Sequence, residues 1–184
     1  MVDQRDYVSV YLTGPSDSST LRQSFSISPF IAGIVNSTYW RTVELRPLSD
    51  FVPLTTYTVT LSTALHAHDG TPLPAPYTFS FRTAPFNVDY ANPNYGSINV
   101  DRNSNVSIHC NSLLDTSTVR ASFAISPPMN VQFDNQEWTQ QISLRPTTSF
   151  SPNTRYTITI STALRSKSGV NLSSPYTLIF TTGQ

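Results

Sequence analysis

The chain carries little charge and only one cysteine. Charged residues make up 12% of the sequence, and 11 basic residues balance 11 acidic ones. A net charge of zero offers no electrostatic basis for binding nucleic acid or an anionic membrane surface. Because Cys110 is the single cysteine, no disulfide can form within the chain. We therefore expect no nucleic-acid partner, and we expect packing alone to hold the fold together.

Long apolar runs and helical periodicity are also missing. No stretch of about 18 apolar residues occurs, so the sequence predicts no insertion into a membrane. A basic N-terminal region followed by an apolar stretch, the mark of a secretory signal, is not visible either. The chain instead consists of short segments rich in Ser and Thr, separated by many of its 14 prolines. That composition is typical of strands and turns rather than helices.

The most informative feature that is present is an internal repeat of domain size. The segment FSISP at Phe25–Pro29 returns as FAISP at Phe123–Pro127. Likewise YTVTLSTAL at Tyr57–Leu65 returns as YTITISTAL at Tyr156–Leu164. The offset, 98 residues in the first pair and 99 in the second, is too long for one unit of a solenoid. The repeat therefore indicates two copies of one domain.

Each copy is predicted to be an all-β domain, with boundaries at residues 1–85 and 86–184. Apolar residues alternate with Thr along the repeated segments, as at Tyr57, Val59 and Leu61. Alternation with a period of two is typical of a half-buried antiparallel strand. The strands predicted in the second copy span residues 97–100, 105–111, 122–126, 131–133, 141–145, 156–162 and 176–182. This many short strands in one domain favour a sandwich of two sheets.

The two copies differ at their start. Residues 1–5 align with Asn99–Asn103, and nothing in the first copy matches Phe86–Ile98. We therefore expect the first domain to lack its opening strand, and Met1 to be an artificial start inside a longer array. A missing strand leaves an open sheet edge, which other strands can join. This edge predicts a strand-edge dimer through the first domain.

Aromatic residues at equivalent positions are the predicted core anchors. The pattern F-x-P-x-T-x-Y at Phe51–Tyr57 and Phe150–Tyr156 resembles the tyrosine corner of immunoglobulin-like sandwiches. In such a corner the Tyr hydroxyl satisfies a backbone group at the bend while the ring fills the core. The predicted core anchors are Trp40, Tyr57, Phe81, Trp138, Tyr156 and Phe180. For the two Trp residues, the alternative hypothesis is an exposed platform that stacks against sugars.

One loop has the residue types of a metal site. His66 and His68, followed by Asp69, supply two imidazoles and a carboxylate, which transition metals accept as ligands. Their counterparts in the second copy include Arg165 and Lys167, which cannot ligate a metal. We therefore interpret these positions as solvated loop residues and predict no metal ion and no cofactor.

Catalytic patterns are equally weak. No G-x-S-x-G sequence marks a nucleophile, and Asp17 and Asp115 precede Ser/Thr turns, where an Asx-type hydrogen bond explains them better than calcium binding. Cys110 lies in an alternating segment and is interpreted as a core residue rather than a reactive thiol. No catalytic residue is predicted.

Five tyrosines are interpreted as ordinary surface residues, with an aromatic binding patch as the alternative. They are Tyr7, Tyr11, Tyr39, Tyr90 and Tyr95.

Taken in order, the motifs resemble the bacterial Ig-like domain of surface-layer proteins and secreted multidomain bacterial proteins. The motifs are P-x-x-G at Pro93–Gly96, D-x-S-T at Asp17–Thr20 and Asp115–Thr118, F-x-I-S-P, L-R-P, P-x-T-x-Y-T and the closing Y-T-x-x-F-x-T. The resemblance covers nearly the whole chain. It implies two tandem immunoglobulin-like (Greek-key) β-sandwiches with no shared catalytic residues.

The same resemblance implies a location and a role. Such domains serve as spacers, stalks and interaction modules outside the cell or at its surface. We therefore expect a non-catalytic structural or adhesion module of a larger bacterial protein. Its expected partners are neighbouring domains of that protein, and a surface protein or a glycan. The alternative is a carbohydrate-binding accessory module of a secreted polysaccharide-active enzyme.

Overall fold

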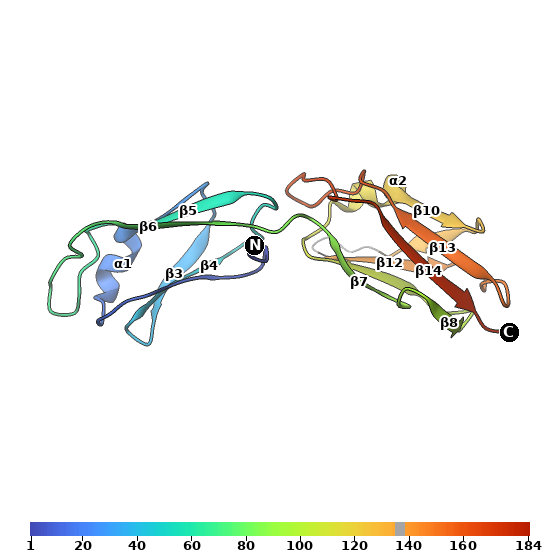
Figure 1. Ribbon diagram of the computed structural model, residues 1–184, viewed down its shortest axis with the longest axis horizontal. Coiled ribbons are helices and arrows are strands. Elements are labelled where there is room, and N and C mark those ends of the chain that lie inside the picture. The colour runs from blue at the N-terminus through green and yellow to red at the C-terminus, as the bar shows by residue number, and fades with distance from the viewer. Residues whose placement is uncertain (135–138) are drawn as a thin grey trace. The chain divides into compact units, whose positions relative to one another are not determined.

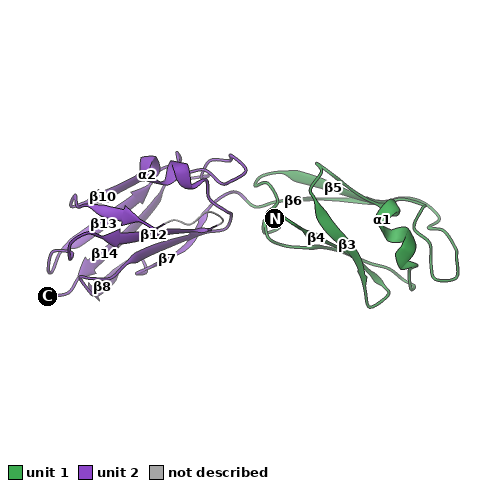
Figure 2. Ribbon diagram, turned by 180° about the vertical axis from the view of Figure 1, so that it is seen from behind, with its two compact units in different colours: residues 1–84 green, residues 85–184 purple. Residues whose placement is uncertain are grey.

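The chain folds into two compact units. In the computed structural model, which describes residues 1–134 and 139–184, these units are Met1–Ala84 and Pro85–Gln184 (Figure 2). The junction lies one residue before the boundary that the repeat predicts. Among the described residues, no helix has the length and apolar character that a bilayer span requires.

The first unit is a sandwich of two three-stranded antiparallel sheets (Figure 1). Its elements are β1 (Val8–Tyr11), α1 (Leu21–Ser24), β2 (Phe25–Ser28), β3 (Gly33–Thr38), β4 (Thr42–Pro47), β5 (Thr56–Leu61) and β6 (Tyr77–Arg82). One sheet has the order β1-β4-β3 and the other β2-β5-β6. The inward residues of the alternating strands, such as Val43 on β4 and Val59 on β5, are fully buried.

The second unit repeats this plan with four strands in each sheet. Its elements are β7 (Val88–Asn92), β8 (Ser97–Val100), β9 (Val106–Cys110), α2 (Val119–Ser122), β10 (Phe123–Ser126), β11 (Val131–Phe133), β12 (Gln141–Pro146), β13 (Arg155–Ile160) and β14 (Tyr176–Thr182). The orders are β11-β12-β9-β7 and β10-β13-β14-β8. The prediction of two all-β sandwiches is confirmed.

Strand β7 was not among the strands predicted from sequence. Its residues Val88–Asn92 do not alternate cleanly between apolar and polar, and its pairing with β9 shifts register between Val88 and Tyr90. Only Ala91 on this strand is fully enclosed by the core. A short strand with one buried residue and a bulge leaves no period-two pattern to find.

The short helices were not predicted either, and the Asp residues of the D-x-S-T turns explain them. Asp17 Oδ1 accepts hydrogen bonds from the Ser19 amide at 2.9 Å and the Ser19 hydroxyl at 2.8 Å. Asp115 accepts the same pair of bonds from Ser117. Each Asp thereby caps a 3-10 turn that leads into α1 or α2. The interpretation of these residues as Asx-type caps is confirmed.

The first unit lacks an opening strand, as the alignment of the two copies predicted, and it lacks counterparts of both β7 and β8. What corresponds to β8 is a single parallel bridge between Val2 and Thr83. This bridge matches the parallel pairing of Val100 with Thr182 in the second unit. Among the residues that the structure describes, no strand covers the outer edges of β1 and β6.

Candidate functional site

A tyrosine corner is formed in both units. Tyr57 Oη accepts a hydrogen bond from the Val52 amide at 3.1 Å. Tyr156 Oη accepts one from the Ser151 amide at 3.0 Å. Both Tyr rings are almost completely buried. Each hydroxyl thus satisfies an amide at the bend where the chain enters β5 or β13, and its role is to hold the sandwich together.

Two further aromatic residues complete these clusters, and they were not selected as anchors. Phe51 and Phe150, the first residues of the same motif, are fully buried. Phe150 packs edge-on against Tyr156 with 4.8 Å between ring centroids, and against Phe180 at 5.4 Å. Phe180 is buried, whereas its counterpart Phe81 is only half-buried. The fixed spacing between Phe and Tyr in the two copies of the motif is the sequence signal from which Phe51 and Phe150 could have been selected as well.

The prediction that Trp40 anchors the core is wrong. The side chain of Trp40 is 67% exposed. It lies in the turn between β3 and β4, before β4 begins at Thr42. Tyr39 and Trp40 adopt positive φ angles of 53° and 65°, which reverse the chain and leave both side chains outside the sheet. The counterpart of Trp40, Trp138, lies outside the described residues.

Trp40 borders a hollow in the first unit that is lined mostly by polar residues. The hollow has a volume of about 360 Å³ and is lined by Ser16, Asp17, Ser18, Ser37, Trp40 and His68. The His68 ring meets the Trp40 ring edge-on, with 5.9 Å between centroids. The hydrogen bond from the Ser19 amide, followed by that from its hydroxyl, lowers the pKa of Asp17 and keeps it ionised. An aromatic face beside hydroxyl and carboxylate groups can bind a polyhydroxylated ligand.

The His66–Asp69 loop does not form a metal centre in the described part of the chain. No group of three or more His, Cys, Asp or Glu residues there could hold a metal ion. Asp69 Oδ1 instead accepts a hydrogen bond from the Thr71 amide at 2.9 Å, which lowers the pKa of Asp69. This bond closes the turn at Gly70, whose φ of 84° favours glycine. These residues shape the loop that carries His68 to Trp40.

Cys110 is a core residue of β9. Its side chain is buried. Burial, and to a smaller degree the nearby charge of Asp89, raises the pKa of the thiol to about 12. A thiol with such a pKa stays protonated at neutral pH and is a poor nucleophile. The interpretation of Cys110 as a packing residue is confirmed.

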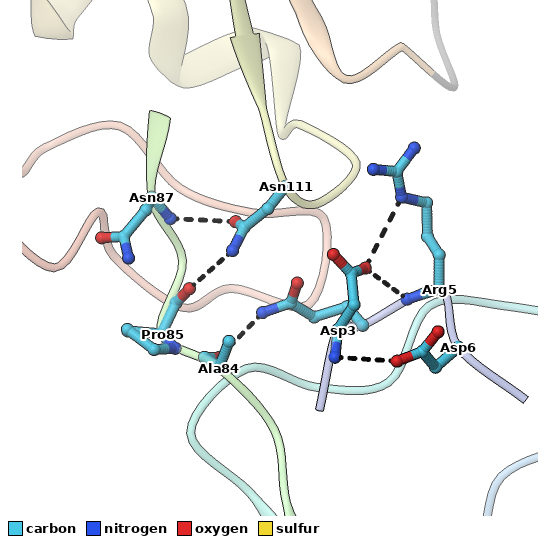
Figure 3. A network of polar contacts seen from close by, with 8 residues as sticks. Asp3, Arg5, Asp6, Ala84, Pro85, Asn87 and Asn111 are labelled. Carbon is cyan, nitrogen blue, oxygen red and sulfur yellow. Dashed lines mark hydrogen bonds and ion pairs between the residues drawn. The ribbon is translucent and has the colours of Figure 1, made fainter. Parts of the chain in front are cut away.

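At the junction between the units, the two consecutive residues Ala84 and Pro85 each accept a hydrogen bond. Ala84 O accepts a hydrogen bond from Gln4 Nε2 at 2.7 Å within the first unit. Within the second unit, Asn111 Nδ2 donates to Pro85 O at 2.9 Å, and the Asn87 amide donates to Asn111 Oδ1 at 2.9 Å (Figure 3). The last anchored residue of one unit is therefore directly followed by the first anchored residue of the next.

Comparison with known families gives one assignment for both halves of the chain. The model of the bacterial Ig-like domain matches residues 2–83 and 82–182. No sequence among curated proteins matches the chain.

Solved structures match the chain only at low sequence identity. An L,D-transpeptidase from Mycobacterium smegmatis matches 54% of this chain and 41% of its own, with 16% identity and a TM-score of 0.40. The Bacteroides ovatus mixed-linkage glucan utilization protein SGBP-B, solved with a mixed-linkage heptasaccharide, matches 100% of this chain and 45% of its own, with 16% identity and a TM-score of 0.38. The N-terminal part of the bacterial S-layer protein SbsC matches 97% of this chain and 42% of its own, with 15% identity and a TM-score of 0.39. The chain thus spans less than half the length of each.

Proposed function

The chain belongs to the bacterial Ig-like domain family in both of its halves, and on that premise we propose that it is a non-catalytic structural module. It serves as a spacer or adhesion segment within a larger exported or cell-surface bacterial protein. Domains of this family are generally non-catalytic. Its partners in this role are the neighbouring domains of the parent protein.

The observation that supports the spacer role is the junction. Ala84 is hydrogen-bonded to the first unit and Pro85 to the second, so no residue lies between the two hydrogen-bonded ends. A proline at the first position restricts the backbone further. A Gly/Ser linker would behave as a flexible coil, whereas a junction of this kind restricts the motion of one domain against the next.

Spin-label distances test the spacer role. Ser26 and Ala124 occupy equivalent exposed positions on β2 and β10, so the Ser26→Cys/Ala124→Cys variant carries one label on each unit. Cys110 remains unlabelled because its thiol is buried and protonated. We expect a narrow distance distribution. The matched control carries a Gly-Gly-Ser insertion between Ala84 and Pro85 and should give a broad distribution. Equal breadth in both proteins would contradict a stiff spacer.

A second function, carbohydrate binding, is supported by the exposure of Trp40. A Trp side chain held outside the core by a strained turn, beside a polar hollow, is available to stack against a sugar ring. Under this hypothesis the Trp40 ring provides the platform, and Asp17 and Ser37 provide hydrogen-bonding groups. The module would then hold the parent protein, a secreted enzyme or a cell-surface protein, on a polysaccharide.

A glycan array tests this second function. We expect binding of the unmodified chain to at least one glycan and a loss of at least about tenfold in Trp40→Ala, the size of effect seen when a binding aromatic is truncated. Tyr11→Ala is the matched control, because Tyr11 is also exposed but lies outside the hollow. A flat response on every glycan, or equal losses in both variants, would dismiss carbohydrate binding at Trp40.

A further inference from the structure

The hollow beside Trp40 in the first unit has one acidic side chain, and the described residues that line it include neither Lys nor Arg. The lining residues are Ser16, Asp17, Ser18, Ser37, Trp40 and His68. Its volume of about 360 Å³ falls within the range of small-molecule sites. We call it the Trp40 hollow. Its charge, in contrast to the neutral chain as a whole, favours a positively charged ligand.

Backbone hydrogen bonds join the segments that form this hollow. The Ser16 amide donates to Trp40 O at 2.8 Å, which ties the Trp40 turn to the segment that carries Asp17. The His68 amide donates to Pro15 O at 3.0 Å, which ties the His68 loop to the same segment. The side chains of the hollow are therefore carried by backbone that is held in place before a ligand arrives, and this lowers the entropic cost of binding.

The Asp17 carboxylate keeps one oxygen for a ligand. Both bonds from Ser19, one from its amide and one from its hydroxyl, end on Oδ1. In the part of the chain that the structure describes, no hydrogen bond or ion pair reaches Oδ2. The bonds from Ser19 also lower the pKa of Asp17, so the carboxylate is ionised at neutral pH. Asp17 therefore presents a negative charge that no basic side chain neutralises.

The Trp40 ring is the second feature that favours a cation. Its side chain is 67% exposed, and the cation–π contacts found among the described residues involve other rings. The face of a Trp ring attracts an ammonium group more strongly than the face of Tyr or Phe. The hollow thus combines an exposed Trp ring with an ionised carboxylate.

The second unit does not reproduce this combination. By the repeat, Asp115 corresponds to Asp17 and forms the same cap, but Lys167 stands at the position of His68. A Lys ammonium is charged at neutral pH and repels a cationic ligand, whereas an imidazole is mostly uncharged there. Binding of a cation is therefore expected in the first unit and not in the second.

We propose that the Trp40 hollow binds a saccharide that carries a protonated amino group. This inference rests on the carbohydrate binding proposed above and names the class of glycan. The ammonium group lies between Asp17 Oδ2 and the Trp40 ring, while hydroxyl groups of the sugar bond to Ser18 and Ser37. An acidic sugar would be repelled by the Asp17 carboxylate, and an uncharged sugar would leave it without an opposite charge.

The Ser residues of the hollow favour a saccharide over the Lys side chain of a protein partner. A Ser hydroxyl can donate one hydrogen bond and accept others, which suits the hydroxyl groups of a sugar. Ser18 and Ser37 supply two such groups beside Asp17. The stem of a Lys side chain consists of methylene groups and would bond to neither.

A matched pair of oligosaccharides tests the inference. A chitosan oligosaccharide carries free amino groups, and the fully N-acetylated oligosaccharide of the same length carries uncharged amides in their place. By isothermal titration calorimetry at neutral pH, we expect the chitosan form to bind at least about tenfold more tightly, because only it makes the charge-assisted bond and the cation–π contact. Asp17→Asn should remove this preference, while the Asn side chain still caps the turn.

Two further variants use the second unit as the reference. Asp115→Asn makes the same change at the equivalent cap and should leave both affinities unchanged. His68→Lys introduces the residue type of Lys167 and should weaken the chitosan form more than the N-acetylated form. As a ligand control, N-α-acetyl-lysinamide has an ammonium group but no hydroxyl and should bind at least about tenfold more weakly than the chitosan form.

The outcomes separate this inference from carbohydrate binding in general. Equal binding of the two oligosaccharides would overturn the inference and leave carbohydrate binding at Trp40 standing. Equal losses in Asp17→Asn and Asp115→Asn would also overturn it, because nonspecific charge attraction would then explain the preference. If neither oligosaccharide binds, the inference is wrong, and the glycan array decides separately whether the hollow binds another glycan. Binding of N-α-acetyl-lysinamide as tight as that of the chitosan form would assign the hollow to Lys side chains instead.

Discussion

At the scale of the residue, the two tyrosine corners are the polar contacts with the clearest structural role. Tyr57 and Tyr156 place their hydroxyls on the amides of Val52 and Ser151 while their rings fill the core. A buried amide that loses its acceptor keeps the cost of leaving water without compensation. The corner therefore stabilises the sandwich through one hydrogen bond as well as through packing.

Tyr156→Phe should lower the free energy of unfolding of the second unit by about 1–2 kcal/mol, since it removes the acceptor of the Ser151 amide and little else. Urea denaturation followed by far-ultraviolet circular dichroism measures the change. Tyr90→Phe is the control, because the side chain of Tyr90 is 57% exposed. Equal effects of the two substitutions would show that the hydroxyl of Tyr156 contributes nothing specific.

At the scale of the element, the same strand behaves differently in its two copies. β6 and β14 share the pattern Y-T-x-x-F, and each pairs on one side with its neighbour, β5 or β13. Only β14 is covered on its other side, by β8. The burial of Phe79 and Phe81 is incomplete for this reason, not because their side chains differ in character from those on β14.

Native-state hydrogen exchange should separate these two strands. We expect the amides of β6 to exchange faster than those of β14, because the uncovered edge lets β6 open locally at a smaller cost in free energy. Mass spectrometry of peptides that span Tyr77–Arg82 and Tyr176–Thr182 gives the comparison within one molecule. Similar protection of both strands would mean that the open edge does not weaken the first unit.

At the scale of the whole molecule, the chain is two sandwiches with cores of unequal continuity. Phe86 and Ala91, from the segment that the first unit lacks, belong to the single cluster of the second. Because stability rises with the apolar area buried on folding, the second unit is expected to be the more stable one.

Calorimetry of the complete chain should therefore show two unfolding transitions. We assign the one at lower temperature to the first unit. Phe180→Ala identifies the other, since removing a fully buried Phe costs about 3–5 kcal/mol and should lower only the higher transition. Phe81→Ala should lower only the lower one, and by less, because Phe81 is half-buried. A single transition moved by both substitutions would indicate that the units unfold together.

The sequence by itself determined the number of domains, the strand alternation, the tyrosine corners and the absence of an opening strand from the first copy. These features depend on local pattern, and the repeat presents each pattern twice. The Asp17 and Asp115 caps are equally local, since each Asp bonds a residue two positions on. Such features are readable because their physical causes lie between near neighbours in the chain.

Only the tertiary structure decided where the less regular parts lie. Trp40 has a large aromatic side chain of the kind that usually fills a core, but a turn with positive φ angles places it outside the sheet. β7 depends on pairing with β9 rather than on its own alternation. The hollow at the end of β1 exists because Leu12, Leu65 and Leu73, which are distant in sequence, meet there. Burial is a property of what surrounds a side chain, and those surroundings come from the folded chain as a whole.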